Sequence, residues 1–198
     1  MFPPRPTELA HRLLRGAIRE GDLVIDATAG NGHDTEFLAE CAGAAGRVIA
    51  FDVQAGAIEA ARRRIGDSGY ASRVEFHEAC HSRIGERAAI GTVAAVMFNL
   101  GYLPGGNHGI TTERSATLRA LESAAGVIKP GGVLSVVCYP GHEAGEDEAS
   151  ATESWMTGLT ACGWRVAKFA MLGTLNPAPF LLIARKPGGS PEEGLVGI

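Results

Sequence analysis

The feature that most constrains the fold is a regular alternation between short apolar runs and longer stretches of helix-forming residues. The apolar runs have the length of strands and cover residues 23–27, 47–52, 74–77, 92–98 and 132–138. Helices are predicted between them at residues 34–41, 54–65, 82–89 and 112–128. Near-continuous apolar strands that alternate with helices are typical of an α/β fold, with a doubly wound parallel sheet buried on both faces.

The two ends of the chain extend this pattern. After the opening prolines, apolar residues at helical spacing predict an amphipathic helix with Thr7 as N-cap and Gly21 as its stop. Near the other end, a helix is predicted at residues 146–162 and strands at 164–172 and 180–184. The short connection at 173–179 has no room for a crossover helix, so the last two strands should be antiparallel. We therefore expect one seven-stranded domain over residues 1–186 and a tail at 187–198 that frays.

Bulk composition excludes several classes of protein. The longest apolar run, residues 93–100, is far shorter than the ~20 residues of a membrane span. The N-terminus lacks the apolar region of a secretory signal, and the four cysteines are widely spread, so we expect a cytoplasmic protein with reduced thiols. The net charge of −4 argues against a broad electrostatic grip on long nucleic acid, while a local basic patch remains compatible with it.

A glycine-rich turn directly follows the first predicted strand. The sequence there reads Asp26-Ala-Thr-Ala-Gly30-Asn31-Gly32-His-Asp34, in a chain with 27 glycines among 198 residues. Ligands of a doubly wound sheet bind beyond the carboxyl ends of its strands, so this turn is a candidate binding loop. Two glycines separated by one residue let the backbone approach a ligand. The carboxylate of Asp26 favours a ligand with a cationic end, such as the amino group of a methionine moiety.

The second and third predicted strands also end in polar residues. Asp52 follows the glycine pair by about 20 residues, where a carboxylate can accept hydrogen bonds from two ribose hydroxyls. The alternative for Asp26 and Asp52 is capping of the next helix. After the third strand, His77, Cys80 and His81 lie where an adenine would bind; a zinc site is the alternative, although a fourth ligand at the usual spacing is lacking.

The fourth predicted strand runs into a loop of unusual composition. It reads Asn99-Leu-Gly-Tyr102-Leu-Pro-Gly105-Gly106-Asn107-His108. This loop resembles the Asn-Pro-Pro-Tyr loop of amino-methylating enzymes, in which the Asn accepts hydrogen bonds from the attacking amine and the aromatic ring stacks on the target base. Asn99 and Tyr102 match that pattern, and Leu-Gly replaces the two prolines. A glycine-rich surface loop with a structural Asn is the alternative.

Together these motifs resemble one bacterial family, the class I S-adenosylmethionine-dependent family labelled rRNA methylase. Its studied members methylate the aminomethyl group of 5-aminomethyl-2-thiouridine at the tRNA wobble position. The resemblance covers about residues 7 to 186 and implies a Rossmann-like class I methyltransferase sheet. The strings that carry it are residues 26–34, Asn99 to Gly106 with Ile110-Thr-Thr112, Tyr139-Pro-Gly-His-Glu143 and Asn176-Pro-Ala-Pro-Phe180.

The resemblance also implies roles for individual residues. The methionine side of the S-adenosylmethionine would be bound by Asp26, Gly30, Asn31, Gly32 and Asp34, the ribose by Asp52 and Gln54, and the adenine region by His81. Asn99, Tyr102 and His142 would be the catalytic residues at the transferred methyl group, with Asn99 also next to the cofactor. Substrate would be bound by Tyr102, Gly105, Gly106, Asn107, His108 and Asn176. No metal is implied. The family pattern has an acid where this chain has Asn107, so His108 or His142 would serve in its place.

The implied substrate is a primary amine in the anticodon stem-loop of tRNA. Such an amine is mostly protonated at neutral pH, so the site must desolvate it or accept its proton at His142 or through water. Candidate RNA contacts are Arg12, Arg15 and Arg19 on the first helix and Arg62, Arg63 and Arg64 on a later one, although charge runs are usually solvated faces. The alternatives are a small-molecule or rRNA methyltransferase, a catalytically silent cofactor-binding homologue and, more weakly, a nicotinamide dehydrogenase, which Thr35 disfavours. A homodimer is compatible with the sequence.

Overall fold

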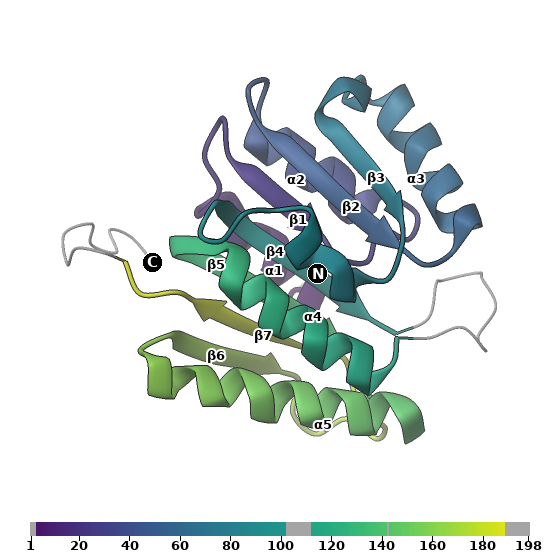
Figure 1. Cartoon of the computed structure of the whole chain (residues 1–198). Coiled ribbons are helices and arrows are strands. Elements are labelled where there is room, and N and C mark those ends of the chain that lie inside the picture. The colour runs from purple at the N-terminus through teal and green to yellow at the C-terminus, as the bar shows by residue number, and fades with distance from the viewer. Residues whose placement is uncertain (1–2, 102–111, 142, 189–198) are drawn as a thin grey trace.

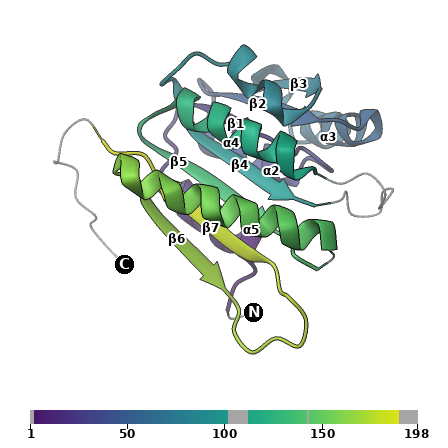
Figure 2. The same ribbon diagram turned by 60° about the horizontal axis from the view of Figure 1, so that its bottom comes forward.

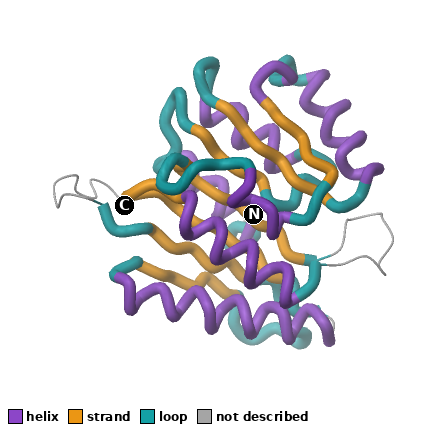
Figure 3. The backbone as a smooth tube through the Cα atoms, in the orientation of Figure 1, coloured by secondary structure: helices purple, strands orange, loops and turns teal. Residues whose placement is uncertain are grey.

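The computed structural model describes residues 3–101, 112–141 and 143–188. Its strands form one central sheet in the order β3-β2-β1-β4-β5-β7-β6 (Figures 1 and 3). The strands are β1 (Leu23–Asp26), β2 (Arg47–Asp52), β3 (Val74–Glu78), β4 (Val93–Leu100), β5 (Ile128–Cys138), β6 (Arg165–Ala170) and β7 (Phe180–Arg185). The predicted doubly wound sheet of seven strands is confirmed.

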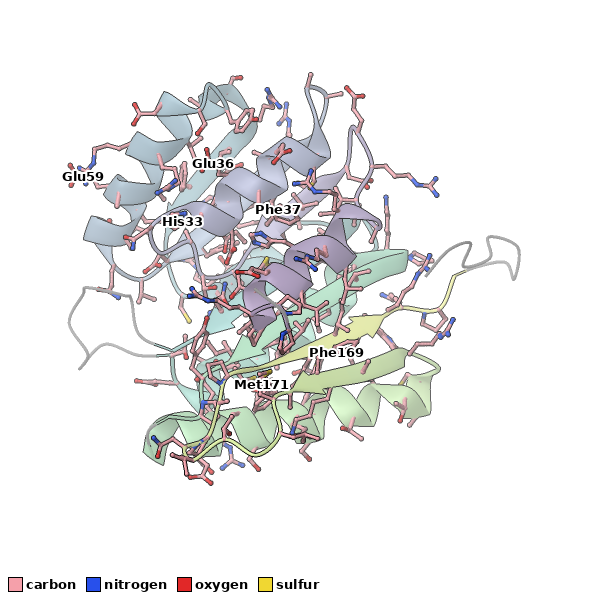
Figure 4. All side chains as sticks on the ribbon, turned by 180° about the vertical axis from the view of Figure 1, so that it is seen from behind. His33, Glu36, Phe37, Glu59, Phe169 and Met171 are labelled. Atoms are coloured by element: carbon pink, nitrogen blue, oxygen red, sulfur yellow. The ribbon has the colours of Figure 1, made fainter. Side chains whose placement is uncertain are left out.

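Helices cover both faces of the sheet. The helices are α1 (Pro6–Arg15), α2 (His33–Ala42), α3 (Ala55–Asp67), α4 (Arg114–Val127) and α5 (Glu143–Gly158), with short 3-10 turns η1 (Ala71–Arg73), η2 (His81–Glu86) and η3 (Leu159–Cys162). Helices α4 and α5 lie in front of the sheet in Figure 1, and α1, α2 and α3 lie on the opposite face, which Figure 4 views directly. Because both faces are covered, the side chains of β4 from Val93 to Phe98 are all fully buried.

The last two strands reverse direction as predicted. Strand β7 lies between β5 and β6 and pairs antiparallel with both, with Ile183 opposite Ser135 on one side and Ala167 on the other. The first five strands are parallel to one another. Strand β6 therefore forms one edge of the sheet, with α5 along its face in Figure 2.

Several predicted boundaries differ from the structure. Helix α1 begins at Pro6 after an extended Arg5, so the N-cap is Arg5 rather than Thr7, and the C-cap is Gly16 rather than Gly21. Proline suits the first helical position because its missing N–H would have no partner there, and it also forces the preceding residue to be extended. The helix predicted at 82–89 is the short 3-10 helix η2, and strand β5 begins at residue 128, four residues earlier than expected.

The tail predicted from residue 187 lies mostly outside the described residues, since only Pro187 and Gly188 are described and both are exposed. In the part of the chain that the structure covers, none of the helices combines the length and apolar character needed to cross a membrane.

Candidate active site

A cleft of the described structure opens at the carboxyl ends of the central strands. Strand β1 lies between β2 and β4, so the chain leaves β1 in one direction and β4 in the other, which is where ligands of such sheets bind. The cleft has a volume of about 1420 Å³. Pockets for one small molecule span about 300 to 1,000 Å³, so this cleft has room for a second ligand group. Its polar walls include Gly30, Asn31, Asp34, Asp52, Gln54, Cys80, His81, Asn99, Thr112 and Tyr139.

The glycine turn after β1 and the acid after β2 are joined by hydrogen bonds. Gly30, at φ +50°, donates its backbone N–H to Asp52 Oδ2 at 2.9 Å, and Gln54 donates its N–H to Asp52 Oδ1, also at 2.9 Å. These two bonds fix the carboxylate at the cleft wall. Each carboxylate oxygen can accept more than one hydrogen bond, so Asp52 retains acceptor capacity for ligand hydroxyls.

Gly32 has a packing role that the sequence did not predict. It is absent from the cleft lining, and its φ of +81° lies in the left-handed region that favours glycine. A Cβ at this position would lie 2.8 Å from Ala61 Cα, because the start of α2 packs closely on α3. This packing alone requires a glycine at position 32, and contact of Gly32 with a ligand stays a prediction.

Asp26 lies beneath the cleft rather than in its wall. Its carboxylate is fully buried and accepts hydrogen bonds from the Thr28 N–H at 3.1 Å and the Thr35 hydroxyl at 2.6 Å. Burial, and then the nearby charge of Asp34, raise the pKa of Asp26 to about 7. Asp26 thus anchors the turn from within, and its direct contact with a cationic ligand stays a prediction.

Asn99 at the end of β4 is held from two sides. Its backbone N–H donates to Thr28 Oγ1 at 2.7 Å, and its side-chain Nδ2 donates to Asp34 Oδ2. Asn99 lines the cleft, and its Oδ1 is buried without a hydrogen-bond partner among the described residues. The other oxygen of Asp34 lies 2.6 Å from Nε2 of His11 on α1. His11 itself stacks on Phe37 of α2, with ring centroids 3.9 Å apart.

His81 presents a neutral acceptor to the cleft. Burial lowers the pKa of this imidazole to about 4, and the ring packs edge-on against Phe98. Its Nε2 is buried without a partner among the described residues. His77 instead stacks on Phe51 outside the cleft lining, and Cys80 reaches the cleft. The described residues contain no group of three or more His, Cys, Asp or Glu side chains that could hold a metal ion.

Two hydrogen bonds join Gly101, Thr112 and Glu148 into a cluster that we call the clamp. Gly101 donates its N–H to Thr112 Oγ1 at 3.0 Å, and the Thr112 hydroxyl donates to Glu148 of α5 at 2.6 Å. Glu148 is only 3% exposed and also accepts a hydrogen bond from the Thr117 hydroxyl at 2.6 Å. The predicted site residues Tyr102, Gly105, Gly106, Asn107, His108 and His142 lie outside the described residues.

Other cleft residues had no predicted role. Tyr139 directly follows β5 and lines the cleft, and its position after a strand was a signal that could have identified it. Arg5 and Thr7 reach the cleft from the start of the chain, which has no such signal. Asn176 is exposed and absent from the cleft lining, whereas the nearby Pro177 and Pro179 are present. The structure therefore does not bring Asn176 to the cleft.

Most of the arginines predicted to contact RNA have partners within the protein. Arg15 donates to both oxygens of Glu40 and lies over Phe37, and Arg63 pairs with Glu59. Arg64 donates to Glu36 and to the carbonyl oxygen of Asn31, and Arg62 lies over Phe76. Arg12 is exposed. Contact of any of these with RNA stays a prediction.

Comparisons with known proteins agree on one family. Residues 48–185 match the family model described as "Putative rRNA methylase". A curated relative, the chloroplastic tRNA (mnm5s2U34)-methyltransferase of Arabidopsis thaliana, is 40% identical over an alignment of 178 residues that covers 85% of this chain and 65% of that protein. The chain therefore spans less than two thirds of that relative's length.

Solved structures give the same result. The structure titled "putative rRNA-methylase from Clostridium thermocellum" is 33% identical, with a TM-score of 0.90, and the match covers 94% of this chain and 100% of that one. A structure titled as a putative methyltransferase from Streptococcus mutans in complex with SAH is 30% identical, with a TM-score of 0.82 and coverage of 92% and 98%. The predicted class I methyltransferase fold is thereby confirmed.

Proposed function

The chain belongs to this rRNA methylase family, and from that premise we propose that it transfers a methyl group to the aminomethyl nitrogen of a wobble-position 5-aminomethyl-2-thiouridine in tRNA. The chain is an S-adenosylmethionine-dependent methyltransferase, in keeping with the SAH-bound neighbour. The name of the Arabidopsis relative supports tRNA as the substrate. The choice of the aminomethyl nitrogen as the methyl acceptor rests on the residues of the cleft.

The cleft residues fit the cofactor group by group. Asp52 and Gln54 would hold the ribose, because the Asp52 carboxylate is fixed at the wall with acceptor capacity left. Cys80 and His81 would flank the adenine, where His81 Nε2 is an acceptor without a partner in the described part of the chain. Gly30, Asn31 and Asp34 would surround the methionine part, with Asp26 supporting their turn from beneath. The bound cofactor supplies a methyl group that its sulfonium makes electrophilic.

We choose an amine as the methyl acceptor because of Asn99, whose Oδ1 has no hydrogen-bond partner among the described residues. An amine nucleophile brings N–H groups, and an acceptor that has no partner among the described residues can bind one of them. Asp34, which already accepts from Asn99, is the nearest carboxylate of the cleft and adds negative charge there. A primary ammonium is attracted to this charge. Once its proton has passed to His142 or to water, the neutral amine can be oriented by Asn99 for an in-line displacement.

The wobble base suits a cleft of this kind. It already lies in a single-stranded loop, so little stacking energy is lost when it enters a pocket. The cleft volume of about 1420 Å³ has room for a base beside the cofactor. We also propose that Tyr102 and His142 are catalytic and that Gly105, Gly106, Asn107 and His108 bind the substrate. The anticodon stem-loop footprint, a homodimer and a cytoplasmic location likewise remain predictions.

Methyl transfer to defined RNAs tests the proposal. Labelled S-adenosylmethionine is incubated with the protein and with two otherwise identical tRNAs, one carrying the aminomethyl group and one carrying unmodified uridine at the wobble position. We expect label in the first RNA alone, and a large loss of that signal in Asn99→Ala with cofactor affinity retained. Equal labelling of both tRNAs, labelling of rRNA instead, or full turnover by Asn99→Ala would contradict the proposal.

A further inference from the structure

We infer that His11 is a positioning residue of this site, which acts through Asp34 to fix the orientation of the Asn99 side-chain amide. The inference rests on the proposed function for its catalytic consequence, but not for its structural part. The three side chains come from three separate elements, α1, α2 and the end of β4. They form a continuous series in which His11 contacts one oxygen of Asp34 and Asn99 contacts the other.

The chemistry of a carboxylate determines which way the Asn99 amide faces. An ionised carboxylate accepts hydrogen bonds and cannot donate, so the atom of Asn99 that approaches Asp34 must be the Nδ2 donor. The Oδ1 atom must then face away from Asp34, where it has no partner among the described residues. Rotation of the amide by half a turn would bring two acceptors together and would offer an N–H donor, rather than an acceptor, to the incoming amine.

His11 is placed to hold the carboxylate in this arrangement. Its Nε2 is 2.6 Å from Asp34 Oδ1, so the ring carries its hydrogen at Nε2 and donates it. The ring is fixed by nearly parallel stacking on Phe37, with 4° between the planes. Asp34 is 8% exposed and therefore has little water to replace a lost donor. Without His11, the carboxylate can rotate, and the bond that orients Asn99 weakens.

The contact between α1 and α2 provides a matched control. Arg15 and Glu40 join the same two helices through an ion pair at 3.0 Å, on an exposed surface and outside the cleft lining. Loss of this ion pair by Glu40→Gln removes a contact between the helices without touching Asp34. A role of His11 in docking the helices alone would make His11→Leu and Glu40→Gln equivalent.

The structural part can be tested without any RNA. The chain has four asparagines and one glutamine, so a ¹⁵N-labelled sample gives five side-chain amide pairs, of which Asn99→Ser identifies one. We expect His11→Leu to displace the Asn99 amide signals, and His11→Gln, which keeps an N–H donor at a similar reach, to restore them. Glu40→Gln should leave them in place. Unchanged Asn99 signals in a folded His11→Leu protein, or the same displacement in Glu40→Gln, would overturn the inference.

The catalytic part uses the same variants in the tRNA methylation assay. We expect His11→Leu to lower kcat by roughly tenfold or more while the KM for S-adenosylmethionine stays near that of the wild type, with His11→Gln close to wild type. A fall in kcat that His11→Gln does not reverse, or a change confined to KM, would contradict the positioning role. If the wild-type protein methylates no aminomethyl-bearing tRNA, the proposed function fails, and the amide signals still decide whether His11 orients Asn99.

Discussion

Replacing Asp26 by Asn should stabilise this protein at alkaline pH. Asp26 is fully buried, and its pKa is raised from the ordinary value of 3.8 to about 7 by burial and by the charge of Asp34. The folded state thus binds a proton more tightly than the unfolded state does. The associated stabilisation is complete below pH 3.8 and is lost as the pH rises through about 7. Over that interval the gap between the two pKa values corresponds to about 4 kcal/mol.

Asn removes the charge and keeps the shape. Its carbonyl oxygen can still accept from the Thr28 N–H, and its amide can donate to the Thr35 hydroxyl, which then acts as an acceptor. We therefore expect the free energy of unfolding of Asp26→Asn to gain on the wild type by about 3 kcal/mol between pH 5 and pH 8.5.

Urea unfolding followed by tryptophan fluorescence measures this difference. The comparison at each pH cancels the shared groups that do not interact with Asp26. Asp67→Asn, a change at an exposed carboxylate of α3, is the control that should show no such trend. If the difference in the free energy of unfolding between Asp26→Asn and wild type stays constant from pH 5 to pH 8.5, Asp26 does not bind its proton more tightly in the folded state.

Three further predictions concern the packing of Gly32, the hydrogen bonds to Glu148 and the reactivity of Cys138. Gly32→Ala should lower the free energy of unfolding by about 2 kcal/mol or more in denaturant titrations, because φ is +81° and the new Cβ would lie 2.8 Å from the α3 backbone. The control Gly66→Ala, which has open space around it, should be neutral or slightly stabilising. Thr112→Val and Thr117→Val should each cost about 1–3 kcal/mol of stability, because each removes a donor from the same buried carboxylate, but only the change at the cleft should also reduce methylation. Burial raises the pKa of Cys138 to about 12, so a thiol reagent at pH 8 should modify this cysteine only after unfolding, as peptide mapping can show.

The sheet could be predicted from the sequence because its signals are local. Each strand is a short apolar run next to a helical stretch, and the brief connection between β6 and β7 leaves antiparallel pairing as the only option. The first and last residues of helices were predicted less accurately where a single residue fixes them, as Pro6 does at the start of α1. The 3-10 helix η2 likewise depends on its packing against α4, which residues in one window do not reveal.

The candidate site was predictable only in part. The position of a residue after a strand identified Asp52 and Asn99, but the same rule selected Asp26, whose side chain is turned beneath the cleft toward Thr35. A sequence does not reveal which of two directions a side chain takes at a strand end. His11 gave no signal, since it lies 23 positions from Asp34 and meets it only through the packing of α1 on α2.

The atom that receives the methyl group can be located directly by mass spectrometry. Aminomethyl-bearing tRNA is treated with the protein and methyl-deuterated S-adenosylmethionine, digested to nucleosides and analysed by tandem mass spectrometry. We expect a labelled nucleoside whose fragments place the deuterated methyl on the exocyclic aminomethyl nitrogen. Label on the ribose, on a ring atom of the base or on another nucleoside would contradict it.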